Sequence, residues 1–498
     1  MIVITEDTFE QFLQSANESS LIDLHAVTFA DPFGMTGILE TGDLLRSEGI
    51  RKTIFLPESE EVLKYLERMD FFKFAADYFT LEPSLPGIAG KYLRSSYSDV
   101  LLEITPIEKS DDIHFIVGKV KERGRAILAK HLHYGERAIG GFVVALSEVC
   151  QNIVEHSETK GFVGIQKYHF QNMDKNVVEI AVMDIGIGFR KSLSQRFPLK
   201  NDLDAIEKGL LHGASRFADA GRGHGLNAVR RFVNEWNGRL SIRSGTAKLS
   251  IIPRWSRGKK TEENLTYFPG AQIHIMLPEI RKFRKTRSPG IFLTRSFFYA
   301  SIESIEEQEI AVTRYNLYRL LKEELKNGSS DLVTRPSGQA IRKRIECELE
   351  KEEEGAVIAL DFSKIGIIDY SCADEVVAKL LSRLLSDEYG DRYIVLTGLN
   401  DNQKENIEVA LERKELSVMA RMRNGREMLL GRLNNYLRET LRFVMENMSI
   451  TAKDLADALE IEANTSGTRL LNLQKKRLVK RVEEARDGGR VWVYEKIS

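Results

Sequence analysis

The chain has 498 residues, of which 42% are hydrophobic and 29% are charged, and its formal net charge is −1. Such a near-neutral balance excludes a protein whose whole surface coats nucleic acid or a charged membrane, although it permits a local basic patch. The length predicts three or four domains, each of which buries its own core.

Cysteine usage and the N-terminal residues indicate a reducing compartment. Cys150, Cys347 and Cys372 are an odd number of cysteines and have no metal-ligand spacing. The N-terminal stretch MIVITEDTFEQ has neither a basic region nor a long apolar run, and no later stretch reads as long enough to span a bilayer. We therefore expect a cytoplasmic protein without a membrane segment.

Residues 1–105 read as a small α/β domain. A strand-like run over 21–29 ends at the turn signal Asp31-Pro-Phe-Gly. A helical pattern over 35–47 and a short apolar strand follow, and an amphipathic helix over 58–69 closes the unit.

Three short motifs stand in a fixed order between Ser147 and Leu226. The first, SEVCQNIVEH, repeats Glu148, Asn152 and His156 every four residues, a spacing that stacks side chains on one helical face. The opposite face carries the apolar residues Phe142, Leu146, Val149 and Ile153. The pattern predicts a helix that packs inward on one side and points an acid, an amide and an imidazole into a site.

The second motif is MDIGIGF, over residues 183–189. A strand-like run ends at Asp184, and Gly186 and Gly188 then let the backbone turn sharply and lie close to a flat ligand.

The third motif is GRGHGL, in which Gly221, Gly223 and Gly225 precede a helical pattern over 226–236. Glycines that open a helix expose backbone N–H groups to phosphate, and the helix dipole favours the negative charge.

In this order the three motifs resemble the nucleotide site of the GHKL superfamily, named for gyrase, the heat-shock chaperone, histidine kinases and the MutL mismatch-repair proteins. The resemblance covers residues 106–280 and implies an α+β sandwich that binds ATP and Mg²⁺. It implies that Asp184 accepts a hydrogen bond from the adenine amino group and that Asn152 ligates Mg²⁺. Glu148 would be the catalytic residue, polarising or deprotonating a water aimed at the γ-phosphate.

Further nucleotide contacts follow from the same resemblance. They are Gly186, Gly188, Gly221, Arg222, Gly223, His224, Gly225 and Leu226. His156 either contacts the ligand or caps the end of its helix, and Cys150 is expected in the core. Residues 190–220 would form a lid, in which Arg216 and the neighbouring Arg222 are either phosphate partners or surface charges.

Two features depart from the family pattern. Ala271 stands where the family often has a threonine that contacts the adenine pocket. No phosphoacceptor-histidine helix precedes the nucleotide domain, because His131 and His133 lack flanking acidic residues and lie close to the first motif. This argues against a sensor histidine kinase, and a glutamate at position 148 suits hydrolysis or transfer to a hydroxyl better.

Residues 281–432 contain a linker and a second α/β unit. The basic run over 281–289 is either a solvated linker or a phosphate-binding surface. A strand-like run from Ala356 then leads through Asp369 into a helix over 373–385, followed by another strand. Strand, acidic turn, helix and strand also occur in this order in residues 1–105, which predicts a diverged internal duplication.

Both units resemble STAS domains, the sulfate-transporter and anti-sigma-antagonist fold. In phosphorylatable STAS proteins a serine directly follows the acid at the turn. Here Tyr370 follows Asp369 and Ser371 comes one place later, while Pro32 follows Asp31. The phosphoswitch serine is therefore assigned to neither copy. Docking or scaffolding is the favoured role, and phosphorylation of Ser371 or Tyr370 stays open.

Residues 433–498 resemble a winged helix-turn-helix. A short helix follows the N-cap-like Thr451, a second helix runs over 463–477, and Asp487-Gly-Gly marks a hairpin turn. The early polar residues of such a second helix enter the DNA major groove. The candidate DNA-contacting residues are Asn464, Thr465, Ser466, Thr468 and Arg469, with Arg486 and Arg490 on the wing. Winged helices also dock proteins, so both kinds of partner stay open.

Three functions are compatible with this organisation. The favoured one is an intracellular, ATP-hydrolysing regulatory protein, in which Mg-ATP switches how the STAS-like and winged-helix modules contact partner protein or double-stranded DNA. The second is a protein serine/threonine kinase like the anti-sigma-factor kinases, and the third is a nucleotide-sensing docking protein without hydrolysis. The resemblance implies a homodimer, and the combination of modules suggests a bacterial regulatory role.

Overall fold

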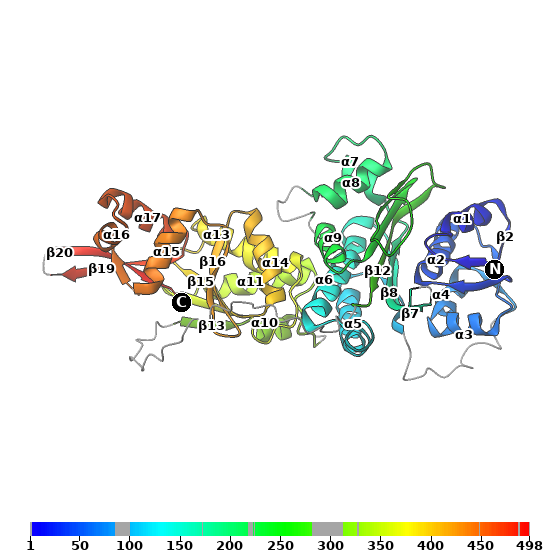
Figure 1. The fold of residues 1–498 in the computed structure, drawn as a ribbon, viewed down its shortest axis with the longest axis horizontal. Coiled ribbons are helices and arrows are strands. Elements are labelled where there is room, and N and C mark those ends of the chain that lie inside the picture. The colour runs from blue at the N-terminus through cyan, green and yellow to red at the C-terminus, as the bar shows by residue number, and fades with distance from the viewer. Residues whose placement is uncertain are drawn as a thin grey trace, which may run out of the picture. The chain divides into compact units, whose positions relative to one another are not determined.

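The computed structural model describes residues 2–84, 100–171, 173–217, 223, 225–280, 312–325, 328–447, 449–486 and 489–497. The chain forms two compact units (Figure 1). The first comprises Met1–Ile280, Leu325–Ala340 and Gly366–Glu375, and the second comprises Arg281–Glu324, Ile341–Ile365 and Val376–Ser498. Both mix helices with sheets, which confirms the expected fold class. The four domain boundaries stay predictions, and the basic run over 281–289 lies outside the described residues.

The first unit begins with a small α/β part. Its elements are β1 (Ile2–Ile4), α1 (Phe9–Glu18), β2 (Leu21–Asp23), β3 (Val27–Ala30), α2 (Pro32–Ser47), β4 (Thr53–Phe55), α3 (Glu60–Arg68), α4 (Phe71–Tyr78) and β5 (Thr80–Glu82). β1 pairs with β3, and β2, β4 and β5 form a separate sheet, all in parallel. The single strand predicted over 21–29 is therefore wrong, because it is broken at 24–26 and its two halves join different sheets.

The centre of the first unit is a seven-stranded antiparallel sheet. Its strands are β6 (Val100–Ile107), β7 (Gly161–Phe170), β8 (Lys175–Asp184), β9 (Arg239–Gly245), β10 (Ala247–Ile251), β11 (Thr261–Glu262) and β12 (Phe268–Pro278). The strand order is β11-β10-β9-β12-β8-β7-β6, and each neighbouring pair is antiparallel.

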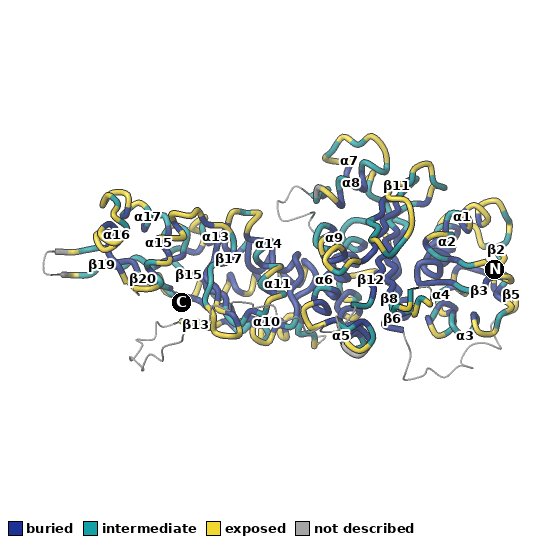
Figure 2. Tube along the Cα trace, viewed as in Figure 1, coloured by how far each residue is buried: buried dark blue, intermediate teal, exposed yellow. Residues whose placement is uncertain are grey.

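Helices cover both faces of this sheet. Side chains alternate along a strand, so Ile180 and Val182 of β8 pack with α5 (Ser110–His131), α6 (Glu136–Asn152) and α9 (Gly225–Glu235). Ala181 and Met183 join the other core, which α2 and the rest of the N-terminal part supply. Figure 2 shows β8 and β12 as mostly buried strands. Burial on both faces explains why β8 reads as a continuous apolar run in the sequence.

Helix α6 is the central helix of this layer. Together with the π-helical turn Ile153–Ser157 it is long and apolar enough to cross a membrane by length and composition, contrary to the sequence-based expectation. However, 72% of its apolar window is buried inside the structure. A core helix of a soluble domain passes the same test, and burial against the sheet is the physical reason for its apolar composition.

The second unit contains a five-stranded sheet with strand order β13-β14-β15-β16-β17. Its elements are β13 (Val312–Asn316), α10 (Leu317–Glu324), β14 (Val357–Asp361), α13 (Leu380–Leu385), β15 (Tyr393–Leu399), α14 (Asp401–Arg413), β16 (Ser417–Met422) and β17 (Glu427–Gly431). The first four strands are parallel and β17 is antiparallel to β16. Residues of α11 (Arg335–Leu349) belong partly to each unit.

The helix predicted over 373–385 begins earlier than expected. It starts as α12 (Tyr370–Ala373), continues as a π-helical stretch over Asp374–Lys379 and ends as α13. Asp369 caps its start, because the Asp369 side chain accepts a hydrogen bond from the Cys372 N–H at 2.8 Å. The cap places Tyr370 and Ser371 in the first helical turn.

The C-terminal elements pack on the sheet of the second unit. They are α15 (Asn435–Asn447), β18 (Ser449–Thr451), α16 (Ala452–Leu459), α17 (Ala463–Lys475), β19 (Val479–Arg486) and β20 (Gly489–Lys496). Leu441, Leu455 and Leu470 share one core with Tyr393 and Val395 of β15. The predicted order of helix, turn, helix and hairpin is present, and Thr451 caps α16 as expected.

Candidate functional site

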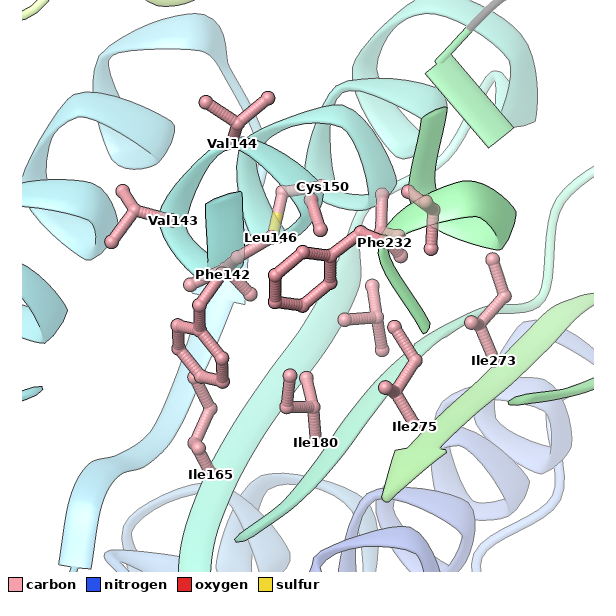
Figure 3. Packing of buried hydrophobic residues seen from close by; sticks show 14 of the residues in the cluster. Phe142, Val143, Val144, Leu146, Cys150, Ile165, Ile180, Phe232, Ile273 and Ile275 are labelled. Carbon is pink, nitrogen blue, oxygen red and sulfur yellow. The ribbon is translucent and has the colours of Figure 1, made fainter. Parts of the chain in front are cut away.

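Helix α6 forms one wall of the site because its other face is fixed in the core. Its apolar side chains pack with Phe232 of α9 and with residues of the sheet (Figure 3). They include Phe142, Leu146 and Cys150. Glu148 and Asn152 line a cavity on the side away from this core. The core position expected for Cys150 is confirmed, and burial raises the pKa of its thiol.

Asn152 has the surroundings of a ligand-binding amide. It ends the α-helical part of α6 and lines the cavity. Its amide nitrogen is buried and has no hydrogen-bond partner among the residues that the structure describes. A buried polar group without a partner costs about 1–3 kcal/mol, so a polar ligand would complete its contacts. An amide oxygen beside phosphate oxygens is also a ligand set that suits Mg²⁺.

Glu148 is buried, with 4% of its surface exposed. Its Oε1 atom accepts hydrogen bonds from the backbone N–H groups of Tyr370, at 3.0 Å, and Ser371, at 3.4 Å. Burial raises the pKa of Glu148 well above its usual range, and the negative charge of Asp369 acts in the same direction. A carboxylate with a raised pKa is a stronger base, as proton removal from water or a hydroxyl requires.

Asp184 ends β8 and lines the same cavity. Its Oδ1 atom accepts a hydrogen bond from the Gly186 N–H at 2.8 Å. Burial raises the pKa of Asp184 to about 7, although the N–H groups of Gly186 and Ala271 lower it. Ala271 pairs with Asp184 across the β8–β12 ladder and lines the cavity beside it. The Asp184 carboxyl is thus held in one orientation by the backbone.

The two glycines of the second motif have different roles. Gly188 lines the cavity with a φ of 67°. A β-carbon there would lie 2.8 Å from Ser244 Oγ, so only glycine fits without strain. Gly186 is not among the residues that line the cavity. Instead, a β-carbon at Gly186 would overlap the carbonyl oxygen of Ser157, so this glycine lets the loop lie against the π-helical turn that follows α6.

The third motif is described only in part. Gly223, Gly225 and Leu226 line the cavity, and α9 begins at Gly225. Gly223 has a φ of 87°. The other predicted contacts of this motif, Gly221, Arg222 and His224, lie outside the described residues. The described positions agree with a glycine-rich turn that opens a helix toward the cavity.

The predicted lid contains α7 (Gly188–Ser194), α8 (Asp202–His212) and Arg216. Arg216 lines the cavity, and its guanidinium pairs with Glu158 at 2.7 Å. The guanidinium also donates to the carbonyl of Glu155 at 2.6 Å. Both roles expected for Arg216, phosphate partner and surface charge, stay predictions.

His156 lies in the π-helical turn that follows α6, not in a regular continuation of the α-helix. It nevertheless lines the cavity, and its ring centroid lies 5.3 Å from that of Phe217. The π-helical turn changes the four-residue spacing that predicted one shared face. A ligand contact by His156 stays a prediction.

A second wall of the cavity comes from residues far along the chain. Arg335, Tyr370 and Ser371 all line it, and all three belong to the first compact unit. Asp369 fixes this wall to α6, because its Oδ2 atom accepts hydrogen bonds from Gln151 Nε2, at 2.8 Å, and from Ser147 Oγ, at 3.1 Å. Ser147 and Gln151, which stand on either side of Glu148 in the first motif, thus attach this wall to α6.

Arg335 was missed by sequence reasoning. Its guanidinium is buried and pairs with Asp374 at 3.0 Å, with Glu375 at 2.8 Å and with Glu155 at 3.8 Å. Burial alone would lower its pKa, but the charges of Glu155 and Asp374 outweigh burial and raise it. The sequence around it, Thr334-Arg-Pro-Ser, is an ordinary helix start and has no signal of a ligand site. The turn at Asp369, in contrast, belongs to a unit for which docking or scaffolding is the role favoured by the sequence.

The empty space in the cavity and its open mouth together is about 980 Å³. The residues that line the cavity include an acid at a strand end, an amide, a buried glutamate, glycines from two turns and two arginines. They are Asp184, Asn152, Glu148, Gly188, Gly223, Gly225, Arg216 and Arg335. This set is suited to a purine base at one end and a polyphosphate at the other.

The candidate DNA-contacting residues are not equally accessible. Asn464, Thr465 and Thr468 are exposed on α17, and Arg490 is exposed on β20 and pairs with Glu483 at 3.3 Å. Arg469 is half-buried and pairs with Glu439, and the side chain of Arg486 lies outside the described residues.

Ser466 is a correction to that set. It is fully buried, and its Oγ donates to the carbonyl of Ala452 at 2.5 Å and to that of Ala463 at 2.8 Å. Ser466 therefore joins α16 to α17 and is not available to a groove.

Residues 140–279 match a family model described as Histidine kinase-, DNA gyrase B-, and HSP90-like ATPase. The matched range contains the α6 wall, the end of β8 and the glycine turn before α9. Neither a curated protein nor a solved structure matches the chain. These residues therefore match the family that the three motifs resemble, and the match supports ATP binding by this part of the chain.

Proposed function

We propose that the protein is an intracellular regulatory ATPase, in which ATP held by residues 140–279 controls the modules that flank this domain. The observation that carries the proposal is the convergence of Asp184, Asn152 and Glu148 on one cavity with the Gly223–Gly225 turn. Each of these residues matches a distinct need of a bound nucleotide: base selection, metal ligation, proton removal and phosphate contact.

Glu148 is the catalytic residue of the proposal. Its raised pKa and its place in the cavity support removal of a proton from a nucleophile beside the γ-phosphate. Asp184 would accept a hydrogen bond from the adenine amino group, which selects adenine over guanine because guanine presents a carbonyl there.

The fit to Mg²⁺ rests on Asn152. Its side-chain oxygen is the atom suited to Mg²⁺, whereas its buried N–H group, which has no partner among the described residues, suits a phosphate oxygen. Mg²⁺ bound with ATP would neutralise part of the charge on the β- and γ-phosphates. Asn152 would supply one oxygen ligand, and Arg216 and Arg335 would lie along the same polyphosphate.

The flanking modules are the parts of the chain that bound ATP is proposed to control. The cap geometry of Asp31, which accepts the Gly34 N–H at 2.7 Å, matches that of Asp369 at the start of α12. This similarity supports two related STAS-like modules, proposed as docking surfaces for a partner protein.

The C-terminal elements are proposed to be a winged helix that contacts double-stranded DNA through α17 and the β19–β20 hairpin, with protein docking as the alternative. A homodimer is proposed from the family resemblance.

Direct nucleotide binding tests the proposal. Purified protein is titrated with a fluorescent ATP analogue in Mg²⁺ buffer, and phosphate release is followed in parallel. Asp184→Asn is expected to weaken binding at least tenfold. Asp174→Asn, in the exposed turn just before the opposite end of the same strand, is the matched control and is expected to bind like the wild type.

Glu148→Gln separates hydrolysis from binding. Loss of a general base typically costs about 10²–10⁴-fold in rate, so phosphate release should fall at least 100-fold while affinity stays within a few fold. Glu136→Gln, at the exposed start of the same helix, is its control. Binding without any phosphate release in the wild type would support the nucleotide-sensing alternative. Absence of ATP binding would overturn the proposal.

A further inference from the structure

A second group of polar side chains is buried in the first unit, on the face of the seven-stranded sheet that α2 covers. Asp31, Glu179 and His274 are 3%, 4% and 3% exposed. Each can offer one oxygen or nitrogen atom, and these atoms all lie within 4.8 Å of one another. Two carboxyl groups and one imidazole are therefore enclosed together, away from solvent.

The fold brings these three residues together from distant parts of the sequence. Ala181 of β8 pairs with His274 of β12, and Glu179 lies on the same face as Ala181 because side chains alternate along a strand. Asp31 caps the start of α2. The ring of Phe33, in the first turn of that helix, lies 5.4 Å from the ring of His274, which fixes the helix start against this face of the sheet.

The polar atoms of the cluster lack protein partners. Neither ring nitrogen of His274 has a hydrogen-bond partner among the residues that the structure describes, and the same holds for Glu179 Oε2. His274 Nε2 and Glu179 Oε2 are 3.8 Å apart, which is beyond hydrogen-bond range. Asp31 Oδ1 accepts a backbone N–H of α2 at 2.7 Å, which orients the carboxyl group and leaves its other oxygen for a ligand. Buried polar atoms are rarely left without a partner, so these atoms suit a ligand that contacts all three side chains.

The charges in the cluster point to a cation. Elsewhere in this unit a buried carboxylate has basic partners, as Glu6 pairs with Arg239 at 2.5 Å and with Lys248 at 3.1 Å. Within the described chain, Asp31 and Glu179 pair with neither a lysine nor an arginine. Burial raises the pKa of Asp31 to about 8, and the charge of Glu179 acts in the same direction. A divalent cation between two carboxylates and a neutral imidazole would make the buried cluster electrically neutral.

We propose that Asp31, Glu179 and His274 bind one divalent transition-metal ion of the Zn²⁺ type, which fastens the start of α2 to β8 and β12. An imidazole with two carboxylates suits Zn²⁺, whereas Mg²⁺ prefers oxygen ligands and water. None of the three residues lines the nucleotide cavity. The inference is therefore independent of ATP binding.

The distances suit Zn²⁺ after small side-chain rotations. Zn²⁺ holds nitrogen and oxygen ligands at about 2.0–2.2 Å, so the ligand atoms of a tetrahedral site lie about 3.3–3.6 Å apart. The separation of His274 Nε2 from Glu179 Oε2 is already close to this value. A second oxygen of one carboxylate, or one water molecule, would complete four-coordination.

The ion would act by joining parts of the fold. Its ligands come from the N-terminal part and from the two central strands, and these strands also carry Asp184 and Ala271 of the nucleotide cavity. The unfolded chain does not hold the three ligands together, so Zn²⁺ would bind the folded state and stabilise it. The thermal stability of the first unit should therefore increase with Zn²⁺ concentration.

The test uses the full-length chain without nucleotide. Zinc content is measured by elemental mass spectrometry in protein purified without chelators, and again after treatment with a chelator, dialysis and reloading with Zn²⁺. We expect about one tightly held ion per chain and a Tm several degrees higher than in the stripped protein. Mn²⁺ should bind about tenfold or more weakly than Zn²⁺. In crystals of the wild type, an anomalous difference map at the zinc absorption edge should place the ion between Asp31, Glu179 and His274.

Two variants remove a ligand. Asparagine caps a helix as well as aspartate does, so Asp31→Asn keeps the cap of α2 and removes a charged ligand. Loss of a residue that merely orients a ligand costs about 10–100-fold in metal affinity, so Asp31→Asn and His274→Gln should each weaken Zn²⁺ binding by about a hundredfold or more. Both should also lose the increase in Tm that Zn²⁺ causes.

Two matched controls keep all three ligands. Glu40→Gln removes another buried carboxyl group of α2. His169→Gln removes an exposed histidine that lies 3.5 Å from Asp174, where a surface ion could bind. Both controls should retain one Zn²⁺ per chain with wild-type affinity.

Each other outcome would overturn the inference. They are a wild-type chain that holds no Zn²⁺ either as purified or after reloading, an anomalous peak at any other place, and undiminished Zn²⁺ affinity in Asp31→Asn and His274→Gln. If a variant does not fold, the location of the ion in the wild type decides the question alone. None of these results affects the proposed ATPase, which is tested separately by nucleotide titration.

Discussion

Glu148 and Gly225 are in direct contact across the cavity, and a β-carbon at residue 225 would overlap Glu148 Oε2. The glycine at the start of α9 is therefore required by the carboxyl of α6 as well as by any phosphate. This contact links the first and third sequence motifs physically, because moving either one moves the other.

Gly225→Ala should displace Glu148 or the start of α9. Overpacking of this kind typically costs about 1–3 kcal/mol, so we expect a Tm several degrees lower and at least tenfold weaker ATP binding. Thermal unfolding and nucleotide titration measure both. Gly118→Ala is the control: Gly118 is exposed within α5, nothing lies within 4 Å of its added β-carbon, and alanine there should raise stability. A Gly225→Ala protein with wild-type Tm and affinity would contradict the contact.

The stability of the protein should depend on pH through Glu148. Its folded pKa is raised, so the folded state binds this proton more tightly than the unfolded state. The associated stability is present below the unfolded pKa of about 4.3 and is lost as pH rises through the folded pKa. Glu148→Gln lacks this loss, and its Tm relative to the wild type should increase between pH 5 and pH 8. A difference in Tm that stays constant with pH would rule out this titration.

ATP affinity should also depend on pH through Asp184. Burial raises the pKa of Asp184 to about 7, and a ligand amino group prefers the ionised acceptor. Affinity should therefore rise between pH 6 and pH 8, by up to tenfold for each pKa unit that binding removes. ATP phosphates titrate in the same range, so Asp184→Asn serves as the reference. Any change of ATP affinity with pH that remains in Asp184→Asn comes from titration of the phosphates. An identical dependence of affinity on pH in both proteins would contradict the prediction.

Thiol labelling should distinguish the three cysteines. Cys347 is exposed, whereas Cys150 and Cys372 are buried and their pKa values are raised by burial. Only a thiolate reacts with maleimide at a useful rate. Without nucleotide we therefore expect one rapidly labelled cysteine per chain, identified by mass spectrometry as Cys347, and three after denaturation. Rapid labelling of Cys150 would mean that α6 is not a core helix.

The proposed DNA contact can be tested by two single substitutions on α17, one of an asparagine and one of a serine. Asn464 is exposed, so Asn464→Ala should weaken DNA binding without changing Tm. Ser466→Ala removes the hydroxyl that is shared between the carbonyls of Ala452 and Ala463, and it should lower Tm at a cost of about 1–2 kcal/mol. Fluorescence anisotropy with duplex DNA and thermal unfolding measure the two effects. Wild-type DNA affinity in Asn464→Ala would favour protein docking over DNA.

Much of the site could be predicted because its key residues are close in sequence. The spacing of Glu148 and Asn152 predicted a helix, the apolar run before Asp184 predicted a strand, and the glycines before residue 226 predicted a helix start. All three elements are present. Residues 140–279 also match the family that these motifs resemble.

The remaining wall could not be predicted from local patterns. Arg335 and Ser371 reach the cavity only through the fold, from positions more than 180 residues after Glu148. The π-helical turn after Asn152 also has no sequence signal, and it changes the register that placed His156 on the face of Glu148. The predicted start of the helix over 373–385 was wrong for a similar reason. Asp369, which caps the helix at Tyr370, is held in place by hydrogen bonds from two residues of α6.

The attachment of residues 369–372 to α6 has a practical consequence for work on fragments. Cutting the chain after Ile280, one residue beyond the matched range, would remove Asp369, the partner of Ser147 and Gln151, and the N–H groups of residues 370 and 371 that contact Glu148. Its carboxyl would then regain an ordinary acidity. A fragment that ends there should therefore differ from the 498-residue chain in the protonation of Glu148.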